Sequence, residues 1–128
     1  MQAMGIPVGW GQDCVLDPWY SLGTADMLDV AFMGLHVAQM THPAEMARCF
    51  TMVTATNAQI MNLPDYGLRP GCVASLVVLD ADNPTEALRL RPDRLAVVSK
   101  GRVVAERQRN DARLDLSGRP ANIRRRLG

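Results

Sequence analysis

Asp13 is the residue of this sequence whose type and setting most clearly allow chemistry. It follows a short apolar stretch, Met4 to Trp10, through a turn punctuated by Gly9 and Gly11. In α/β barrels, catalytic groups sit at strand ends of this kind. The structural alternative is an aspartate that only forms the turn after the strand. The residues alone leave both interpretations open.

The two histidines add little to this site. His36 falls on the polar stripe of a predicted helix, which favours a solvated or hydrogen-bonded surface residue. His42 precedes Pro43 at a predicted helix start, which favours a capping or loop residue. A zinc pair is not expected, since a helix end and a loop lie between them. We also find no Ser/His/Asp or Cys/His arrangement and no glycine-rich phosphate loop.

Three cysteines, Cys14, Cys49 and Cys72, are widely spaced and form no CxxC pair. An odd number at such spacing favours reduced thiols over a disulfide framework. We expect them to be packing residues in a cytoplasmic protein.

The composition is that of an ordinary soluble protein of one domain. The chain has 128 residues, a net charge of +1, and no apolar run near the ~20 residues that a membrane span needs. Its first residues lack the pattern of a signal peptide. We therefore expect no nucleic-acid partner, no membrane and a cytoplasmic location.

The last quarter of the chain is basic. After Gln108 the hydrophobic periodicity fades, which predicts an irregular or partly disordered tail. Such a charge run is usually solvated, and contact with nucleic acid or an acidic partner is the alternative. The arginines are Arg107, Arg109, Arg113, Arg119, Arg124, Arg125 and Arg126.

Hydrophobic periodicity predicts helices in the first half of the chain. Apolar residues recur at helical spacing over residues 24–40, with Thr24 or Ser21 as the N-cap. A second helix is predicted over 43–53, and a short third helix over 57–63.

Strands are predicted in the second half. The runs Leu76–Leu79 and Leu95–Val98 are continuously apolar, which predicts strands buried on both faces. A Lys-Gly pair predicts a hairpin turn between Leu95–Ser99 and Arg102–Glu106. One or two helical turns are expected over Thr85–Leu90.

Three separated stretches resemble the amidohydrolase superfamily, and most closely its cytosine deaminases. They run from Gly5 through the Asp-Pro-Trp-Tyr segment to His36, from Thr54 to Leu63, and from Tyr66 to Asp80. Asn57 and Gln59 stand where the second stretch usually has proline and arginine. Ser75 replaces a common aspartate in the third.

The resemblance implies an α/β fold. The family is built as a metal-dependent TIM barrel with a small β-sandwich that both chain ends form. Residues 1–66 would supply the last barrel strand and the helices after it. Residues 67–128 would supply the C-terminal strands of the sandwich and the basic tail.

The resemblance also implies a site. Asp13 would be the aspartate that contacts the metal or its water and passes a proton to the leaving amine. Trp19 would line the pocket against a flat base. Gln12 and Cys14 would flank the substrate's edge, where cytosine deaminases commonly have His and Asp. The family metal is divalent zinc or iron.

The implied function is hydrolysis of C–N bonds in cyclic amidines or nucleobases, with a small cyclic amide as substrate. Catalytic metals usually take about three protein ligands, and this chain offers one carboxylate. We therefore expect a fragment that binds no metal and is inactive alone. The alternatives are a half that complements a separate N-terminal chain, and a stand-alone oligomeric binding module. Self-association, as a symmetric dimer, would cover unpaired strand edges and apolar helix faces.

Overall fold

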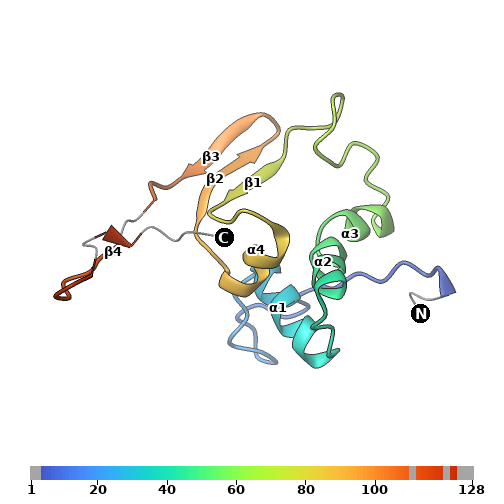
Figure 1. Ribbon diagram of the computed structural model, residues 1–128. Helices are drawn as coiled ribbons and strands as arrows, with labels where there is room; N and C mark the ends of the chain where they lie inside the picture. Colours follow the sequence, from blue (N-terminus) through green and yellow to red (C-terminus); the bar gives the residue numbers. More distant parts are fainter. Residues whose placement is uncertain (1–3, 110–111, 120–121, 124–128) are drawn as a thin grey trace.

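A cluster of helices and an antiparallel sheet lie side by side in the computed structural model (Figure 1). The structure describes residues 4–109, 112–119 and 122–123. The helices are α1 (Met27–Val37), α2 (Pro43–Met52), α3 (Ala55–Ile60) and α4 (Pro84–Leu90). The strands are β1 (Leu76–Leu79), β2 (Arg94–Ser99), β3 (Arg102–Glu106), β4 (Ala112–Arg113) and β5 (Asn122–Ile123). Within these ranges, no helix is long and apolar enough to cross a bilayer.

Helix α1 begins later than the sequence predicts, and its N-cap is Asp26 instead of Thr24 or Ser21. The Asp26 carboxylate accepts a hydrogen bond from the backbone N–H of Leu28 at 2.9 Å. Ala25 has a φ of +58°, which is left-handed and incompatible with a helix that starts before it. The backbone at Ala25 therefore corrects the predicted cap.

Helices α2 and α3 follow the predicted signals with changed ends. His42 is the N-cap of α2, and its backbone N–H donates to the Glu45 carboxylate at 3.2 Å, which confirms the capping role. Pro43 occupies the first helical position, as expected. Helix α3 starts at Ala55, before the predicted start at residue 57, and ends at Ile60, before the predicted end at residue 63. Asn62 takes a left-handed φ of +53°, which a continuing helix does not allow.

The core lies between α1, α2 and α4. Helix α4 forms over the whole predicted stretch, and the Asn83 side chain caps it by accepting from the N–H of Glu86 at 2.9 Å. Ala87 and Leu88 of α4 come after residue 66, where the sequence suggested a boundary between two parts of the chain. They nevertheless pack into the same core as α1 and α2. The buried residues of this cluster are Leu28, Ala31, Leu35, Cys49, Val53, Ala87 and Leu88.

Strands β1, β2 and β3 form one antiparallel sheet in that order, which confirms all three strand predictions. The turn between β2 and β3 has left-handed φ values at Lys100 (+49°) and Gly101 (+79°). Left-handed geometry at both central residues matches the right-handed twist of a hairpin. The local turn residues therefore set this pairing.

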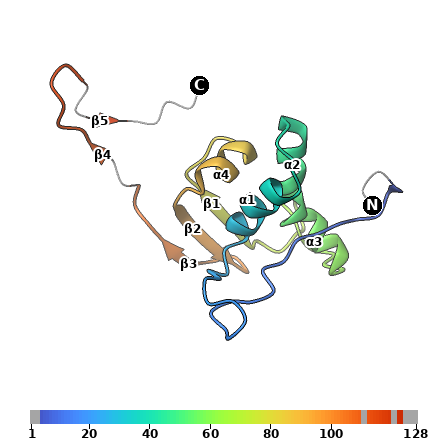
Figure 2. The same cartoon turned by 90° about the horizontal axis from the view of Figure 1, so that it is seen from below.

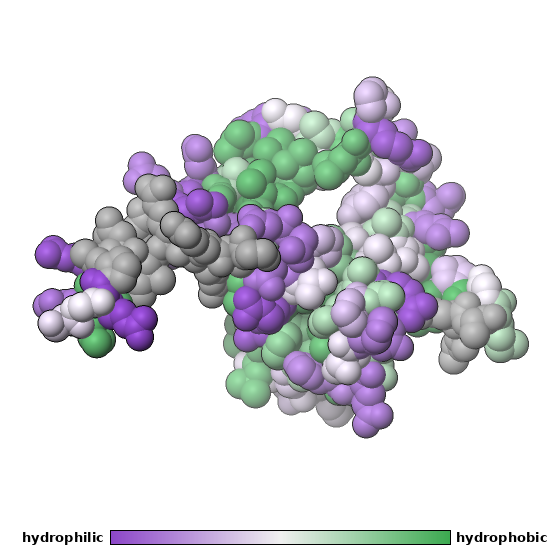
Figure 3. Space-filling model, in the orientation of Figure 1, coloured by the Kyte–Doolittle hydropathy of each residue, from purple (hydrophilic) through white to green (hydrophobic). Residues whose placement is uncertain are grey.

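The sheet is not buried on both faces, which corrects the prediction from its apolar runs. Val77 on β1 is 51% exposed and Val103 on β3 is 60% exposed. Leu79 is the one described strand residue that packs against the helical core. Figure 3 shows hydrophobic residues gathered over the sheet. A continuous apolar strand needs a layer on each side, and the described part of the chain supplies no second layer here.

The N-terminal segment crosses the helical cluster without forming the expected barrel strand (Figure 2). The backbone of residues 6–13 has no ladder partner among the residues that the structure describes. The N–H of Trp10 instead donates to the carbonyl oxygen of Met52 at 3.2 Å. A strand exists only beside another strand, so the apolar pattern alone could not produce one.

The described part of the basic end contains two short strands that the sequence did not predict. Strands β4 and β5 pair as a short antiparallel ribbon that projects from the body (Figure 2). Arg107 donates to Asp93 at 2.8 Å and Arg109 pairs with Asp80, while both arginine side chains stay more than half exposed, as the prediction of a solvated charge run expects. The predictions for residues 124–126 lie outside the described residues.

Candidate functional site

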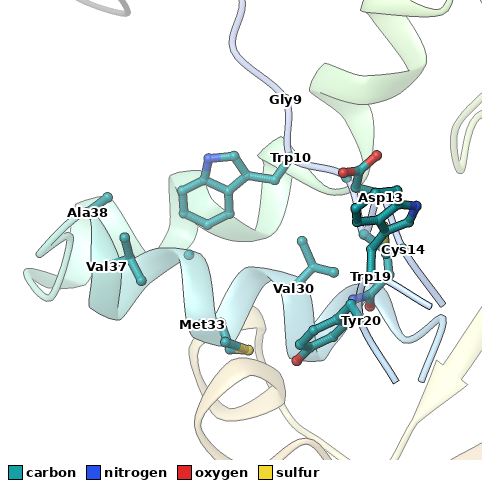
Figure 4. A pocket seen from close by; sticks show the side chains of 13 residues that line it. Gly9, Trp10, Asp13, Cys14, Trp19, Tyr20, Val30, Met33, Val37 and Ala38 are labelled. Atoms are coloured by element: carbon teal, nitrogen blue, oxygen red, sulfur yellow. The ribbon is translucent and has the colours of Figure 1, made fainter. Parts of the chain in front are cut away.

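An open pocket of about 610 Å³ lies between the loop that follows Val8 and one side of α1. Its polar residues gather at one end, where Figure 4 shows Asp13 and Cys14 beside the Trp19 indole. Helix α1 supplies an apolar wall. The residues that line it include Trp10, Gln12, Asp13, Cys14, Trp19 and Tyr20, with Val30, Met33, Gly34 and Val37 from α1. The pocket thus brings together every residue that the sequence placed at the site.

Asp13 stands at the rim of this pocket with an exposed side chain. Its backbone is left-handed, with a φ of +63°. Aspartate tolerates this geometry better than most residues, at a cost of roughly 1 kcal/mol or more. Within the described residues, no backbone N–H donates to its carboxylate. The backbone of the turn therefore leaves the Asp13 oxygens free, and the neighbouring Cys14 thiol is the group of the turn that hydrogen-bonds to them.

Asp17 is the aspartate that organises the turn. Its Oδ1 accepts hydrogen bonds from the backbone N–H groups of Trp19 at 2.8 Å and Tyr20 at 3.0 Å. The bonds from Tyr20 and Trp19 lower the pKa of the Asp17 carboxyl below its ordinary value, because they favour the charged form. Asp17 thereby sets the loop that presents both aromatic side chains, including the 89% exposed Trp19.

Cys14 lies between the two carboxylates. Its hydrogen bond with Asp17 raises the pKa of the thiol, with smaller contributions from desolvation and the negative charge of Asp13. Each effect disfavours the thiolate, which is the nucleophilic form. At neutral pH Cys14 is therefore a neutral thiol that can donate a weak hydrogen bond.

The other cysteines agree with the predicted chemistry. All three are free thiols in this structure. Cys49 is fully buried in the core, where burial raises the pKa of its thiol. Cys72 is partly buried.

Trp10 is a wall of the pocket that sequence reasoning missed, since the residue reads as an ordinary core or loop aromatic. Its indole lies on α1 (Figure 4) and packs so closely on Gly34 that a Cβ there would lie 2.4 Å from the ring. A glycine on the apolar face of a predicted helix was the available signal, because such a glycine usually has a packing reason.

The described residues do not by themselves fit a zinc or iron centre. Among them, no group of three His, Cys, Asp or Glu side chains could hold a metal ion. His36 is exposed, and its ring meets Phe32 edge-to-face with centroids 4.6 Å apart. His42 caps α2. Of the metal-ligating types, only Asp13 and Cys14 line the pocket.

Comparison with known families and sequences gives one consistent result. The model of the amidohydrolase family matches residues 1–105. The chain is 27% identical over 103 residues to N-isopropylammelide isopropyl amidohydrolase of Pseudomonas sp. (strain ADP), covering 80% of this chain and 26% of that protein. It is 32% identical over 106 residues to pterin deaminase of Rhizobium rhizogenes, covering 81% and 24%.

Solved structures agree. The 5-methylcytosine deaminase of Klebsiella pneumoniae, liganded with 5-fluorocytosine, superposes with a TM-score of 0.83 at 36% identity, covering 88% of this chain and 28% of that one. N-isopropylammelide isopropylaminohydrolase of Burkholderia multivorans gives a TM-score of 0.79 at 34% identity, covering 82% and 27%. The chain spans about a quarter of the length of these relatives.

Proposed function

Because the chain belongs to the amidohydrolase family, we propose that it forms the part of a deaminase-type amidohydrolase that contains the reactive aspartate and one wall of the substrate pocket. The reaction is hydrolysis of a C–N bond in a cyclic amidine or nucleobase. The deaminase names of a curated relative and of a structural neighbour support this class of substrate.

The observation on which the proposal rests is the position of Asp13. Its carboxylate lies at the polar end of an aromatic pocket, while Asp17 satisfies the backbone of the turn. An aromatic wall suits a planar ring, which can stack on it or meet it edge-on. Trp19 provides that wall beside Asp13, and Trp10 and Tyr20 extend it along the pocket.

Asp13 moves a proton in this proposal. The oxygen of water bonds to the ring carbon that carries the amino group, and water gives one proton to Asp13. The bond from that carbon to the amino nitrogen then breaks. The amino group takes the proton from Asp13 and leaves as ammonia. A positioned carboxylate that takes the proton from water and passes it to the leaving amine raises the rate by about 10²–10⁴-fold. Asp13 can do this because no backbone donor within the described residues engages its oxygens.

Gln12 and Cys14 contact the edge of the substrate ring. The Gln12 amide can both donate and accept hydrogen bonds, and the raised pKa of Cys14 keeps its thiol a neutral donor. By the resemblance described above, cytosine deaminases would have His and Asp at these positions. We therefore infer that this pocket prefers a ring with a less basic edge than cytosine.

The rest of the metal site lies outside these 128 residues. One carboxylate can be only one of the about three protein ligands of a catalytic metal. We propose that the remaining ligands come from an N-terminal amidohydrolase chain, which would also cover the apolar side of α1. The 128-residue chain alone is then inactive.

The experiment measures ammonia release from cytosine, isocytosine and related cyclic amides with added Zn²⁺ or Fe²⁺. The full chain is assayed alone and with the part of the Klebsiella pneumoniae deaminase outside the matched quarter. We expect turnover only by the pair, and a loss of about 10²-fold or more with Asp13→Asn. Asp17→Asn is the matched control, because its amide oxygen still accepts the loop's hydrogen bonds.

Two outcomes would contradict the proposal. One is a pair that co-elutes and binds metal but releases no ammonia. The other is a pair whose turnover survives Asp13→Asn. A flanking reading frame that encodes a His-x-His chain would independently support complementation.

The second candidate function is a stand-alone oligomeric binding module. The exposed sheet favours it, since Val77 and Val103 would need a covering surface. It predicts a folded oligomer that neither binds metal nor gains activity from a second chain.

A further inference from the structure

We propose that Asn57 is a positioning residue that clamps the segment bearing Trp10 and Asp13 against α3. Its side-chain Nδ2 donates to the carbonyl oxygen of Trp10 at 2.7 Å, across 47 positions of sequence. This inference rests on the proposed function, because it concerns how Asp13 is aimed.

The Trp10 peptide is held from both sides. Its N–H donates to Met52 at the end of α2, and its carbonyl oxygen accepts from Asn57 in α3. The described residues give this segment no neighbouring strand. These two bonds therefore hold in place a backbone that would otherwise have no fixed register.

Asn57 is not explained by its own helix. Asparagine is a poor helix former, since its side chain competes for backbone hydrogen bonds. A tertiary hydrogen bond accounts for asparagine at this position.

Gly9 is matched to Asn57. A Cβ at Gly9 would lie 1.8 Å from the Asn57 Oδ1 and 2.9 Å from its Cγ. Any larger residue at position 9 would therefore displace the amide. Gly9 has no left-handed φ, so the requirement is space and not backbone freedom.

The clamp acts on both functional parts of the pocket. It fixes the residue whose indole packs on Gly34, and it fixes the start of the turn that places Asp13 at the rim. Displacement of a catalytic group by about 1 Å can lower a rate by about 10²-fold. Asn57 would thus affect the chemical step without touching substrate.

The structural test is a double-mutant cycle on the full chain, read by thermal unfolding. Gly9→Ala alone should lower the melting temperature by about 5 °C or more, because the methyl group overlaps the amide. In the Asn57→Ala background the same change should lower it much less, toward the effect of Gly11→Ala, with Ile60 Cδ1 at 3.0 Å from the added Cβ as the remaining close contact. Gly11 is the control because a Cβ there would meet nothing within 4 Å. Equal effects of Gly9→Ala in both backgrounds would overturn the clamp.

A second variant decides the matter if Gly9→Ala does not fold. Asn57→Asp keeps the size of the side chain but removes the donor. In a chain labelled with 5-fluorotryptophan, this change should shift the ¹⁹F resonance of Trp10 and leave that of Trp19 in place. An unmoved Trp10 resonance would refute the hydrogen bond.

Activity separates positioning from folding. In the complemented assay, Asn57→Asp should lower kcat by about 10-fold with KM within about 2-fold, since Trp19 is held by Asp17 and not by Asn57. An unchanged kcat would overturn the positioning role even if the cycle shows coupling. If the unmutated pair has no activity, the proposed function fails, while the cycle still decides the clamp.

Discussion

Asp13 and Asp17 lie in one loop, but their hydrogen-bond partners give the two aspartates different roles. Asp17 accepts two backbone hydrogen bonds and shapes the turn that carries Trp19. Asp13 has no backbone donor within the described residues and stands at the pocket rim in left-handed geometry. The division leaves Asp13 available for a proton or a ligand. It also makes the order of the loop depend on the charge of Asp17.

The loop should lose order in acid. The folded-state pKa of Asp17 is below its ordinary value, so ionised Asp17 stabilises the loop at higher pH. That stabilisation is lost as the pH falls below about 4 and through the lowered pKa. We expect the ¹⁹F resonance of 5-fluorotryptophan at position 19 to move in that range. Asp17→Asn, which keeps an acceptor at all pH values, should flatten the change; a variant that titrates like the unmutated chain would contradict it.

Helix α1 links the pocket to the sheet. Its apolar side forms the pocket wall, and its N-cap, Asp26, pairs with Arg94 of β2. Arg94 also donates to the carbonyl oxygen of Pro92 at 3.0 Å. One side chain thus caps the helix and joins it to a strand that lies far away in sequence. The position of the pocket wall depends on this junction.

Two substitutions at Asp26 separate the cap from the ion pair. Asp26→Ala should lower the free energy of unfolding by about 1–2 kcal/mol, since the N–H of Leu28 loses its acceptor. Asp26→Asn keeps the acceptor and loses the charge, so it should cost about 0.2–1 kcal/mol for a partly exposed pair. Urea unfolding measures both. Equal losses would mean that the ion pair, and not the cap, dominates.

At the scale of the whole molecule, the three-stranded sheet has an uncovered apolar surface and an unpaired edge among the described residues. Its order is β1-β2-β3, so the outer edge of β3 has no ladder partner among the described residues. Val103 and Val104 on that strand are 60% and 57% exposed. An apolar edge strand is a ready template for pairing with another chain. We therefore propose a homo-oligomer, a symmetric dimer, for the chain without its complementing partner.

Sedimentation at several concentrations tests this association. We expect a monomer–dimer equilibrium that Val103→Lys weakens by about 10-fold or more, because a charge would be buried at the edge. Leu116→Lys is the control, since that leucine is equally exposed at 60% but lies off the sheet. A monomer at all concentrations, with sharp NMR lines and cooperative melting, would contradict the expectation.

Local sequence was sufficient wherever neighbours in the chain determine the structure. The Lys-Gly turn sets the β2–β3 hairpin, and His42 with Pro43 starts α2. The residues of the pocket rim were also predictable, because Asp13 and Trp19 lie in one short stretch that resembles a known family. Hydrogen bonds and steric limits within a few residues decide all of these features.

Only the tertiary structure decided the features that join distant segments. Trp10 became a pocket wall because it meets Gly34, and Asn57 became a clamp because α3 lies beside residue 10. The N-cap of α1 depends on a left-handed residue before it and is reinforced by Arg94. Apolar strands indicate that a covering layer is needed, but not whether the same chain provides it. Such contacts depend on where the folded chain brings residues together, which the spacing of residue types does not specify.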